Sequence, residues 1–245
     1  MILMFMKNLF LSLIIPLLIL EAALAGNLYS AGISKTAMEP AMQDNKDYQI
    51  LYNGRIWRNL YSRVRGTQFL FTDAFMQGSV VMGNRLFTDL YLRYDIYNDE
   101  VQIRTDKDII LQLNKEMVSG FSLIYNNRTY NFKKLEGDSA VIKGGYYNTL
   151  YKGRAELLVS YKKEIMLLAV DRKYDQFDQY HRIYLRKGGV IYPIRKKSDL
   201  PKLFGVNKKD VKNFVKNRRI TVTVKDPDSI SSLAEFCDNF AKDEQ

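Results

Sequence analysis

The 245-residue chain carries 37 lysine and arginine residues against 27 aspartate and glutamate residues, a formal net charge of +10. Its single cysteine, Cys237, excludes an internal disulfide, but a chain of this length can bury enough surface to fold without one. One histidine, His181, is present, and G-x-S-x-G, H-E-x-x-H, Walker A and dinucleotide-binding motifs are absent, so no common enzyme class has a signature here.

Residues 1–25 have the pattern of a secretory signal peptide. Lys7 precedes a continuous apolar run, and the run is followed by Ala-Leu-Ala, which supplies the small residues of a cleavage site after Ala25. The alternative is a transmembrane anchor, which needs about 20 apolar residues. Pro16 interrupts the run and Glu21 follows it, so we expect a cleaved signal and a periplasmic or secreted protein. No later run is long enough to span a bilayer.

Residues 26–47 mix Gly, Ser, Pro and charged residues without a period, and we expect a flexible lead-in. From residue 48 to residue 195 the chain has short β-branched and aromatic runs. The stretch "RLFTDLYLRYDIYNDEVQIRT" alternates with a period of two, as a half-buried strand does. We expect one face to carry the apolar residues Leu90, Leu92, Tyr94 and Ile96, and the other to carry Asp89, Arg93 and Asp95.

Turn residues recur along the rest of this segment. Asn98-Asp99, Gly83-Asn84, Asn126-Asn127 and Gly188-Gly189 each fall between two strand-like runs, which predicts β-hairpins. The stretch 154–170 fits a helix or a long strand, and its Tyr and Val content favours the strand. Eight to ten strands without alternating helices predict a fold that is α+β but mainly β: an antiparallel sheet, either a sandwich or an open half barrel.

Residues 196–245 are predicted to form a small helical appendage packed on the β domain. Residues 198–205 fit one short helical turn, Asn207 can cap the next helix, and Asp228 or Ser229 can cap the last. The β-branched stretch 220–224 predicts a further strand between the last two helices. Two apolar stripes follow helical spacing: Val211, Phe214 and Val215 in the first helix, and Ile230, Leu233, Ala234, Cys237 and Phe240 in the second.

The positive charge is concentrated in one stretch. Residues 182–225 hold 14 basic and 2 acidic residues, whereas residues 226–245 hold 1 basic and 6 acidic. Such a local excess attracts anions. We therefore predict that an anionic envelope component or another envelope protein binds a basic face, whose candidate residues are Lys208, Lys209, Lys212, Lys216, Arg218 and Arg219. The alternative is a solvated face that the acidic last helix partly neutralises. Nucleic acid is not expected as a partner of an exported chain.

The candidates for catalysis are weak. A dyad of Cys237 and His181 would need distant parts of the chain to meet, and Cys237 lies on an apolar helical stripe. Three acidic residues near His181 (Asp171, Asp175 and Asp178) have no diagnostic metal-ligand spacing and are interleaved with basic residues. We therefore predict no catalytic residues, metal or cofactor. Aromatic side chains can instead contact a sugar ring or a lipid, and the candidates are Tyr146, Tyr147, Tyr151 and Trp57, with packing inside the sheet as the alternative.

Three phrases, "LRYDIYNDEVQI", "GYYNTLYKGRAELLVSYKK" and "YLRKGGVIYPIRKKSDLPKLFG", resemble segments of uncharacterised exported proteins of Gram-negative bacteria. The resemblance implies a secreted protein with a β-rich body and no assigned activity. Together these observations predict a non-enzymatic cell-envelope protein that binds its partner through the basic C-terminal face. One alternative is a periplasmic lipid or lipoprotein carrier with an apolar cavity, and another is a hydrolase with His181 near a carboxylate.

Overall fold

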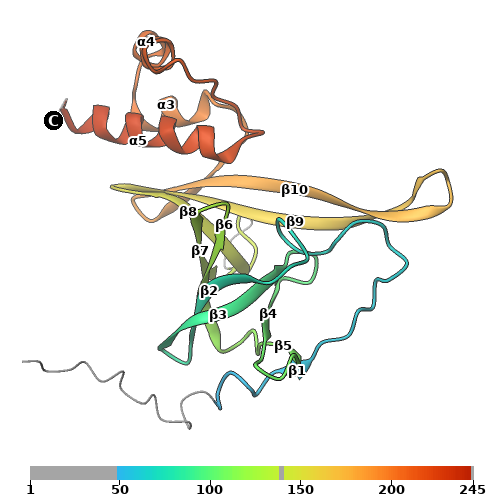
Figure 1. Cartoon of the computed structure of the whole chain (residues 1–245). Helices are drawn as coiled ribbons and strands as arrows, with labels where there is room; N and C mark the ends of the chain where they lie inside the picture. Colours follow the sequence, from blue (N-terminus) through green and yellow to red (C-terminus); the bar gives the residue numbers. More distant parts are fainter. Residues whose placement is uncertain (1–48, 138–140, 244–245) are drawn as a thin grey trace, which may run out of the picture. The chain divides into compact units, whose positions relative to one another are not determined.

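A computed structural model of the chain describes residues 49–137 and 141–243, which belong to one compact unit, Lys46–Gln245. The predicted signal peptide (1–25) and lead-in (26–47) lie outside these residues. The described part contains eleven strands and, after them, three helices (Figure 1). Their bounds are β1 Arg55–Ile56, β2 Met76–Met82, β3 Arg85–Asp95, β4 Glu100–Arg104, β5 Ile110–Gln112, β6 Val118–Tyr125, β7 Arg128–Leu135, β8 Gly145–Lys152, β9 Ala155–Val170, β10 Tyr174–Lys187, β11 Val190–Ile194, α3 Asp199–Phe204, α4 Lys208–Arg218 and α5 Pro227–Asp243.

All eleven strands belong to one antiparallel sheet in the order β1-β5-β4-β3-β2-β6-β7-β8-β9-β10-β11, and the sheet is not closed. This confirms the predicted mainly β fold with helices at its C-terminal end. The predicted hairpin turns also form. Asn84, Asn127, Gly188 and Gly189 all have positive φ angles, between 56° and 80°, which Asn and Gly tolerate best.

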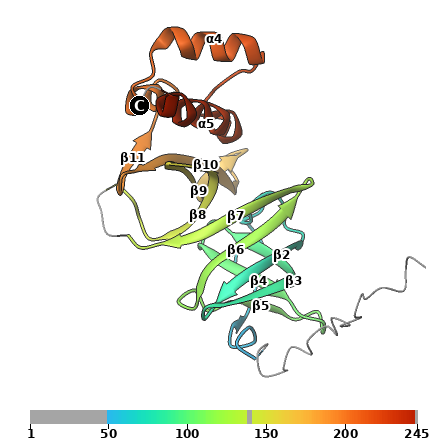
Figure 2. The ribbon, with the colours of Figure 1, turned by 90° about the vertical axis from the view of Figure 1, so that its left-hand side faces the viewer.

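Contacts between aromatic rings on strands that are not neighbours show that the sheet is strongly curved. Tyr94 in β3 and Phe132 in β7 are three positions apart in the strand order, so in a flat sheet they would lie about 14 Å apart. Their ring centroids are 5.3 Å apart. Phe121 and Tyr146 complete the cluster, at 5.0 and 5.9 Å from Tyr94. Figure 2 shows β6 and β7 crossing β2 and β3. Buried side chains of all four strands belong to one core cluster.

The predicted polar face of β3 is not exposed along its whole length. Arg93 and Asp95 are buried, with 6% and 0% of their surface accessible. The chain segment before β2 covers this face, and the Arg93 guanidinium lies 3.9, 4.4 and 4.5 Å from the ring centroids of Phe69, Trp57 and Phe75. The interpretation of this strand as buried on only one face was therefore wrong at its C-terminal end, because the segment before β2 supplies a second apolar layer.

We expect the substitution Arg93→Lys to lower the free energy of unfolding by about 1–2 kcal/mol. The planar guanidinium stacks on three rings and also donates to Gln102 Oε1 at 2.9 Å and to the Asp73 carbonyl at 3.0 Å, and an ammonium cannot reproduce that geometry. Urea unfolding would measure the loss. Arg172→Lys, at the exposed turn between β9 and β10, is the control and should change stability by less than about 0.5 kcal/mol. Equal stability of both variants would contradict the role given to Arg93.

The stretch 154–170 forms a strand, as predicted, and it pairs with β10 in the longest ribbon of the sheet. The register runs from Ala155↔Lys187 to Val170↔Tyr174, with one irregularity near the turn. Residues of β9 alternate between two faces. Leu157 and Val159 join the main core, whereas Leu158 joins a second small cluster on the opposite face, with Ile142, Tyr147 and Tyr184.

The helical segments begin and end close to the predicted positions. Asn207 caps α4 by accepting hydrogen bonds from the backbone N–H groups of Lys209 and Asp210, at 2.9 and 3.0 Å. The predicted cap of the last helix was wrong. Asp226, two residues earlier than predicted, accepts from the Asp228 N–H, while Ser229 bonds to Thr223 and Asp226.

The predicted strand at 220–224 was also wrong. This stretch has no regular secondary structure and pairs with no strand of the described sheet, and its apolar residues are buried or half-buried. Val222 is 5% exposed and packs in the core. The apolar stripe of α5 is confirmed, since Ile230, Leu233, Ala234 and Cys237 are buried. Among the described residues, no helix has the length and hydropathy needed to cross a membrane.

Candidate functional site

The three C-terminal helices enclose an apolar groove of about 530 Å³. Its floor comes from α3, the link to α4, the stretch before α5 and α5 itself. The four residues, in that order, are Pro201, Val206, Val222 and Leu233. All four are buried. Its wall is α4, which has no buried residue: Val211 and Val215 are only half-buried and line the groove.

One aromatic contact holds α4 in this position. Phe214 stacks on Phe236 of α5, with ring centroids 4.3 Å apart and planes 14° apart. The three residues of the predicted α4 stripe therefore have two different environments. Phe214 anchors the helix to α5, and Val211 and Val215 remain facing the groove rather than a closed core. An apolar wall that stays half-exposed beside a preformed hollow is the usual geometry of a ligand site.

Lysine side chains line the same groove. They come from the turn before α3, from α3 and from α4, and are Lys197, Lys202, Lys208, Lys212 and Lys216. Within the part of the chain that the structure describes, none of the five forms an ion pair. Three acidic side chains of α5 are described, and none of them pairs with these lysines: Asp228 pairs with Arg128, Asp238 pairs with Arg154, and Glu235 forms no ion pair within the described part of the chain. The groove therefore combines an apolar floor with uncompensated positive charge.

The predicted basic residues separate into two groups. Lys208, Lys212 and Lys216 recur at intervals of four and line the groove. The others are exposed but do not contribute to it: Lys209 lies elsewhere on α4, Arg218 lies over the Phe214 ring at 5.6 Å, and Arg219 ends the helix with a φ of 52°.

The four aromatic residues predicted to contact a ligand also lie in different environments. Tyr146 is 1% exposed and packs in the ring cluster of the core. Tyr151 donates its hydroxyl to Asp238 at 2.9 Å and so joins β8 to α5. Trp57 packs beside Arg93 at the margin of a shallow pocket near β1. Tyr147 lines a small cavity of about 210 Å³ on the face of β8, β9 and β10 that carries the second cluster.

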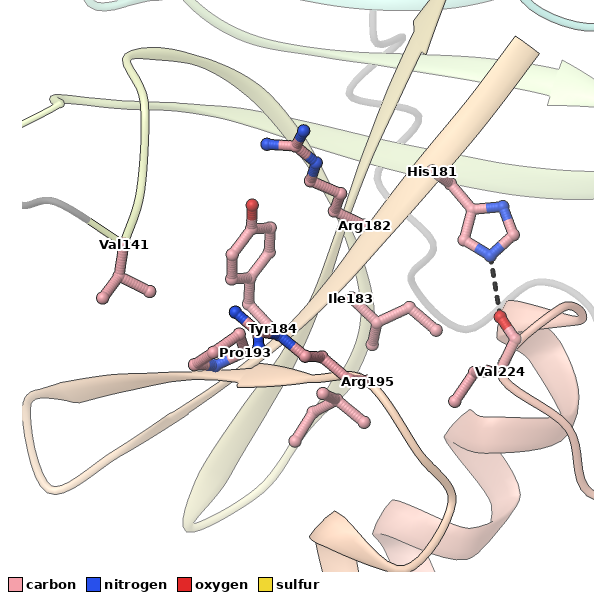
Figure 3. A pocket seen from close by; sticks show the side chains of 9 residues that line it. Val141, His181, Arg182, Ile183, Tyr184, Pro193, Arg195 and Val224 are labelled. Carbon is pink, nitrogen blue, oxygen red and sulfur yellow. Dashed lines mark hydrogen bonds between the residues drawn. The ribbon is translucent and has the colours of Figure 1, made fainter.

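A larger cavity, about 650 Å³, adjoins it at the end of β11 (Figure 3). His181 Nε2 lies 2.8 Å from the carbonyl oxygen of Val224, and Figure 3 shows the ring pointing away from the side of β10 that carries Arg182 and Tyr184. The hydrolase alternative needs a carboxylate at His181, and the partner found there is a backbone carbonyl.

The surroundings of Cys237 do not favour a nucleophilic thiolate, which a dyad with His181 would need. The cysteine is fully buried in α5, and burial, with a smaller contribution from Asp238, raises the pKa of its thiol to about 12. The thiolate, which is the nucleophile, is therefore scarce at neutral pH. Within the described ranges, no group of three His, Cys, Asp or Glu residues is arranged to hold a metal ion.

Comparisons of this chain with protein-family models, with curated proteins and with solved structures found no match. The candidate sites therefore depend on geometry alone. Sequence reasoning missed half of the groove. The i, i+4, i+8 spacing of Lys208, Lys212 and Lys216 marks one face of a helix, but no pattern indicates that Pro201, Val222 and Leu233, from three other segments, complete the floor beside that face.

Proposed function

We propose that this chain is a non-enzymatic, exported binding module of the cell envelope, and that it binds a single-chain anionic amphiphile in the groove between α3, α4 and α5. The observation that carries the proposal is the combination of an apolar floor with lysines that have no partner among the described residues. An uncharged apolar ligand would leave the lysines without a counter-charge, and a hydrophilic anion would leave the apolar floor exposed to water. A ligand with an acyl chain and one anionic head group uses both.

The size of the groove supports a single chain. Ligand pockets commonly have volumes of about 300–1,000 Å³, and 530 Å³ lies within that range. Burial of about eight methylene groups, at about 0.8 kcal/mol each, would contribute about 6 kcal/mol, which corresponds to a dissociation constant of tens of micromolar. The carrier alternative needs an apolar cavity beneath the sheet, and the ring cluster of Tyr94, Phe121, Phe132 and Tyr146 fills that space. We therefore assign the ligand to the helical groove.

The test compares two ligands with the same acyl chain, lysophosphatidylglycerol, which is anionic, and lysophosphatidylcholine, which is zwitterionic. Isothermal titration calorimetry on the full chain, below the micellar concentration, should show tighter binding of the anionic lipid. Reversing one rim charge with Lys212→Glu should weaken that binding about 3- to 10-fold, as expected for a partly exposed charge pair. Val215→Asp should weaken the binding of both lipids more than 10-fold, because it places a carboxylate in the apolar wall.

The matched control is Lys209→Glu. It makes the same charge change on the same helix at an exposed residue that does not line the groove, so lipid affinity should stay within about 2-fold of the wild type. If Lys209→Glu and Lys212→Glu weaken binding equally, overall charge rather than the groove attracts the lipid. If Val215→Asp leaves affinity unchanged, the acyl chain lies elsewhere. Either result overturns the assignment.

A further inference from the structure

The small cavity beside Tyr147 is built from three neighbouring strands. In the register of β9 and β10, Ser160 lies opposite Arg182, Lys162 opposite Tyr180, and Leu158 opposite Tyr184. Because side chains alternate along a strand, all six point to the face opposite the main core. Leu158 and Tyr184 pack with Tyr147 in the second cluster and form the apolar base, and the remaining residues surround a space of about 210 Å³.

Ser160 is the first observation that indicates a ligand. Its residue is 6% exposed and it lines the cavity, yet within residues 49–137 and 141–243 its hydroxyl makes no hydrogen bond. A hydroxyl that faces a cavity and has no protein partner there is free to donate a hydrogen bond to a ligand or to accept one from it. The Tyr147 hydroxyl, by contrast, donates to the Lys143 carbonyl at 2.7 Å. Burial chiefly raises the pKa of Tyr147 to about 12, so it remains a donor at neutral pH.

The second observation is the charge around the cavity. Lys162 pairs with Asp99 at 2.9 Å and is neutralised. Arg182 and Lys143 form no ion pair within the described part of the chain, and the Arg182 guanidinium lies 5.6 Å from the centroid of the Tyr180 ring. Figure 3 shows Arg182 and the Tyr184 hydroxyl on the same side of β10. The guanidinium group of arginine binds carboxylate and phosphate groups in a two-pronged geometry that lysine cannot reproduce.

From this arrangement we propose that the cavity binds a small anionic sugar, a sugar acid or a sugar phosphate. Arg182 holds the carboxylate or phosphate, the Tyr180 and Tyr184 rings pack along the sugar, and Ser160 exchanges a hydrogen bond with a sugar hydroxyl. The volume favours one ring, because it is smaller than the pockets that hold drug-sized ligands. This site shares no residue with the helical groove, so the inference does not depend on the proposed amphiphile.

The experiment titrates the full chain with glucuronate, glucose 6-phosphate, glucose and inorganic phosphate, following amide chemical shifts by NMR. We expect saturable shifts at residues of β9 and β10 with glucuronate or glucose 6-phosphate, and at least 10-fold weaker binding of glucose. If inorganic phosphate binds as tightly as glucose 6-phosphate, the site takes an ion alone and the sugar part of the proposal is wrong. Equal binding of glucose and glucuronate would remove the role of the charge.

Two variants locate the site. Arg182→Gln should weaken binding of the better acidic sugar about 10- to 100-fold, and Ser160→Ala about 3- to 10-fold. Arg172→Gln makes the same change as the first at the exposed turn of the same ribbon and should leave affinity within 2-fold. Thermal unfolding checks that each variant is folded. Unchanged affinity in a folded Arg182→Gln protein overturns the proposal, as would a loss of sugar binding in the groove variant Lys212→Glu.

Discussion

Replacing Asp99 with asparagine is expected to lower the free energy of unfolding by about 3 kcal/mol, one of the two largest stability effects that we expect. The carboxylate is 6% exposed and accepts a hydrogen bond from the Tyr94 hydroxyl at 2.5 Å. Lys115 Nζ and Lys162 Nζ lie 2.7 and 2.9 Å from its two oxygens. An asparagine fits the space but leaves both ammonium groups without a counter-charge, and about a third of each lysine side chain is exposed, which limits the loss.

Urea unfolding at pH 7 measures this effect. Asp108→Asn is the matched control, because that carboxylate is exposed and faces Arg104 at 3.8 Å in a surface ion pair. Removing the charge of Asp108 should lower the free energy of unfolding by less than about 0.5 kcal/mol. A cost of Asp99→Asn no greater than that of the control would show that the two lysines are satisfied by solvent and that the buried cluster adds nothing to stability.

The same cluster predicts how stability depends on pH. Burial alone would raise the pKa of Asp99, but Lys162, Lys115 and the Tyr94 hydroxyl together lower the pKa below its usual value of 3.8. A carboxyl group whose pKa is lower in the folded state stabilises the fold above its unfolded pKa, and that stability is lost as the pH falls through the folded pKa. Between pH 5 and pH 2, wild-type stability should therefore fall more steeply than that of Asp99→Asn. Parallel curves would assign acid unfolding to other groups.

The second large effect is expected from Asp238→Ala, which should cost about 2–4 kcal/mol and loosen α5 from the sheet. Asp238 is 3% exposed. Its Oδ2 accepts from the Tyr151 hydroxyl at 2.9 Å and from the Arg154 backbone N–H at 2.8 Å, and Oδ1 faces Arg154 Nε at 3.3 Å as an ion pair without a well-aligned hydrogen bond. Alanine leaves the Tyr151 hydroxyl and the turn between β8 and β9 without these partners.

Hydrogen exchange read by mass spectrometry would detect the change locally, as faster exchange in α5. The control is Asp228→Ala, which removes an exposed carboxylate of the same helix that pairs with Arg128 at the surface and should cost less than about 1 kcal/mol. Because Leu233 of α5 forms part of the groove floor, Asp238→Ala should also weaken lipid binding. Normal exchange in α5 would show that its apolar stripe alone holds the helix in place.

Local sequence patterns were sufficient for most of the strands and helices. Period-two alternation and the Asn and Gly turns identified the hairpins, and Asn207 correctly marked the start of α4, because these signals act within a few residues. The failures at 220–224 and at the cap of α5 have different causes. A β-branched stretch becomes a strand only if a neighbouring edge is available, and a cap is chosen by the backbone that precedes the helix.

The candidate sites were predictable only in part. The excess of lysine in residues 182–225 and the helical spacing of Lys208, Lys212 and Lys216 are properties of the linear chain, and they indicated an anion-binding face without its apolar floor. Tyr147 was singled out without Ser160 and Arg182, its neighbours on the next strands. The long loop before β2 buried Arg93, and the packing of α5 brought Leu233 beside α4. Short stretches of sequence determine where the charges lie and which residues form individual helices and strands. Which side chains line the same groove or cavity depends on strand register and helix docking. Both are set by contacts between residues far apart in the chain.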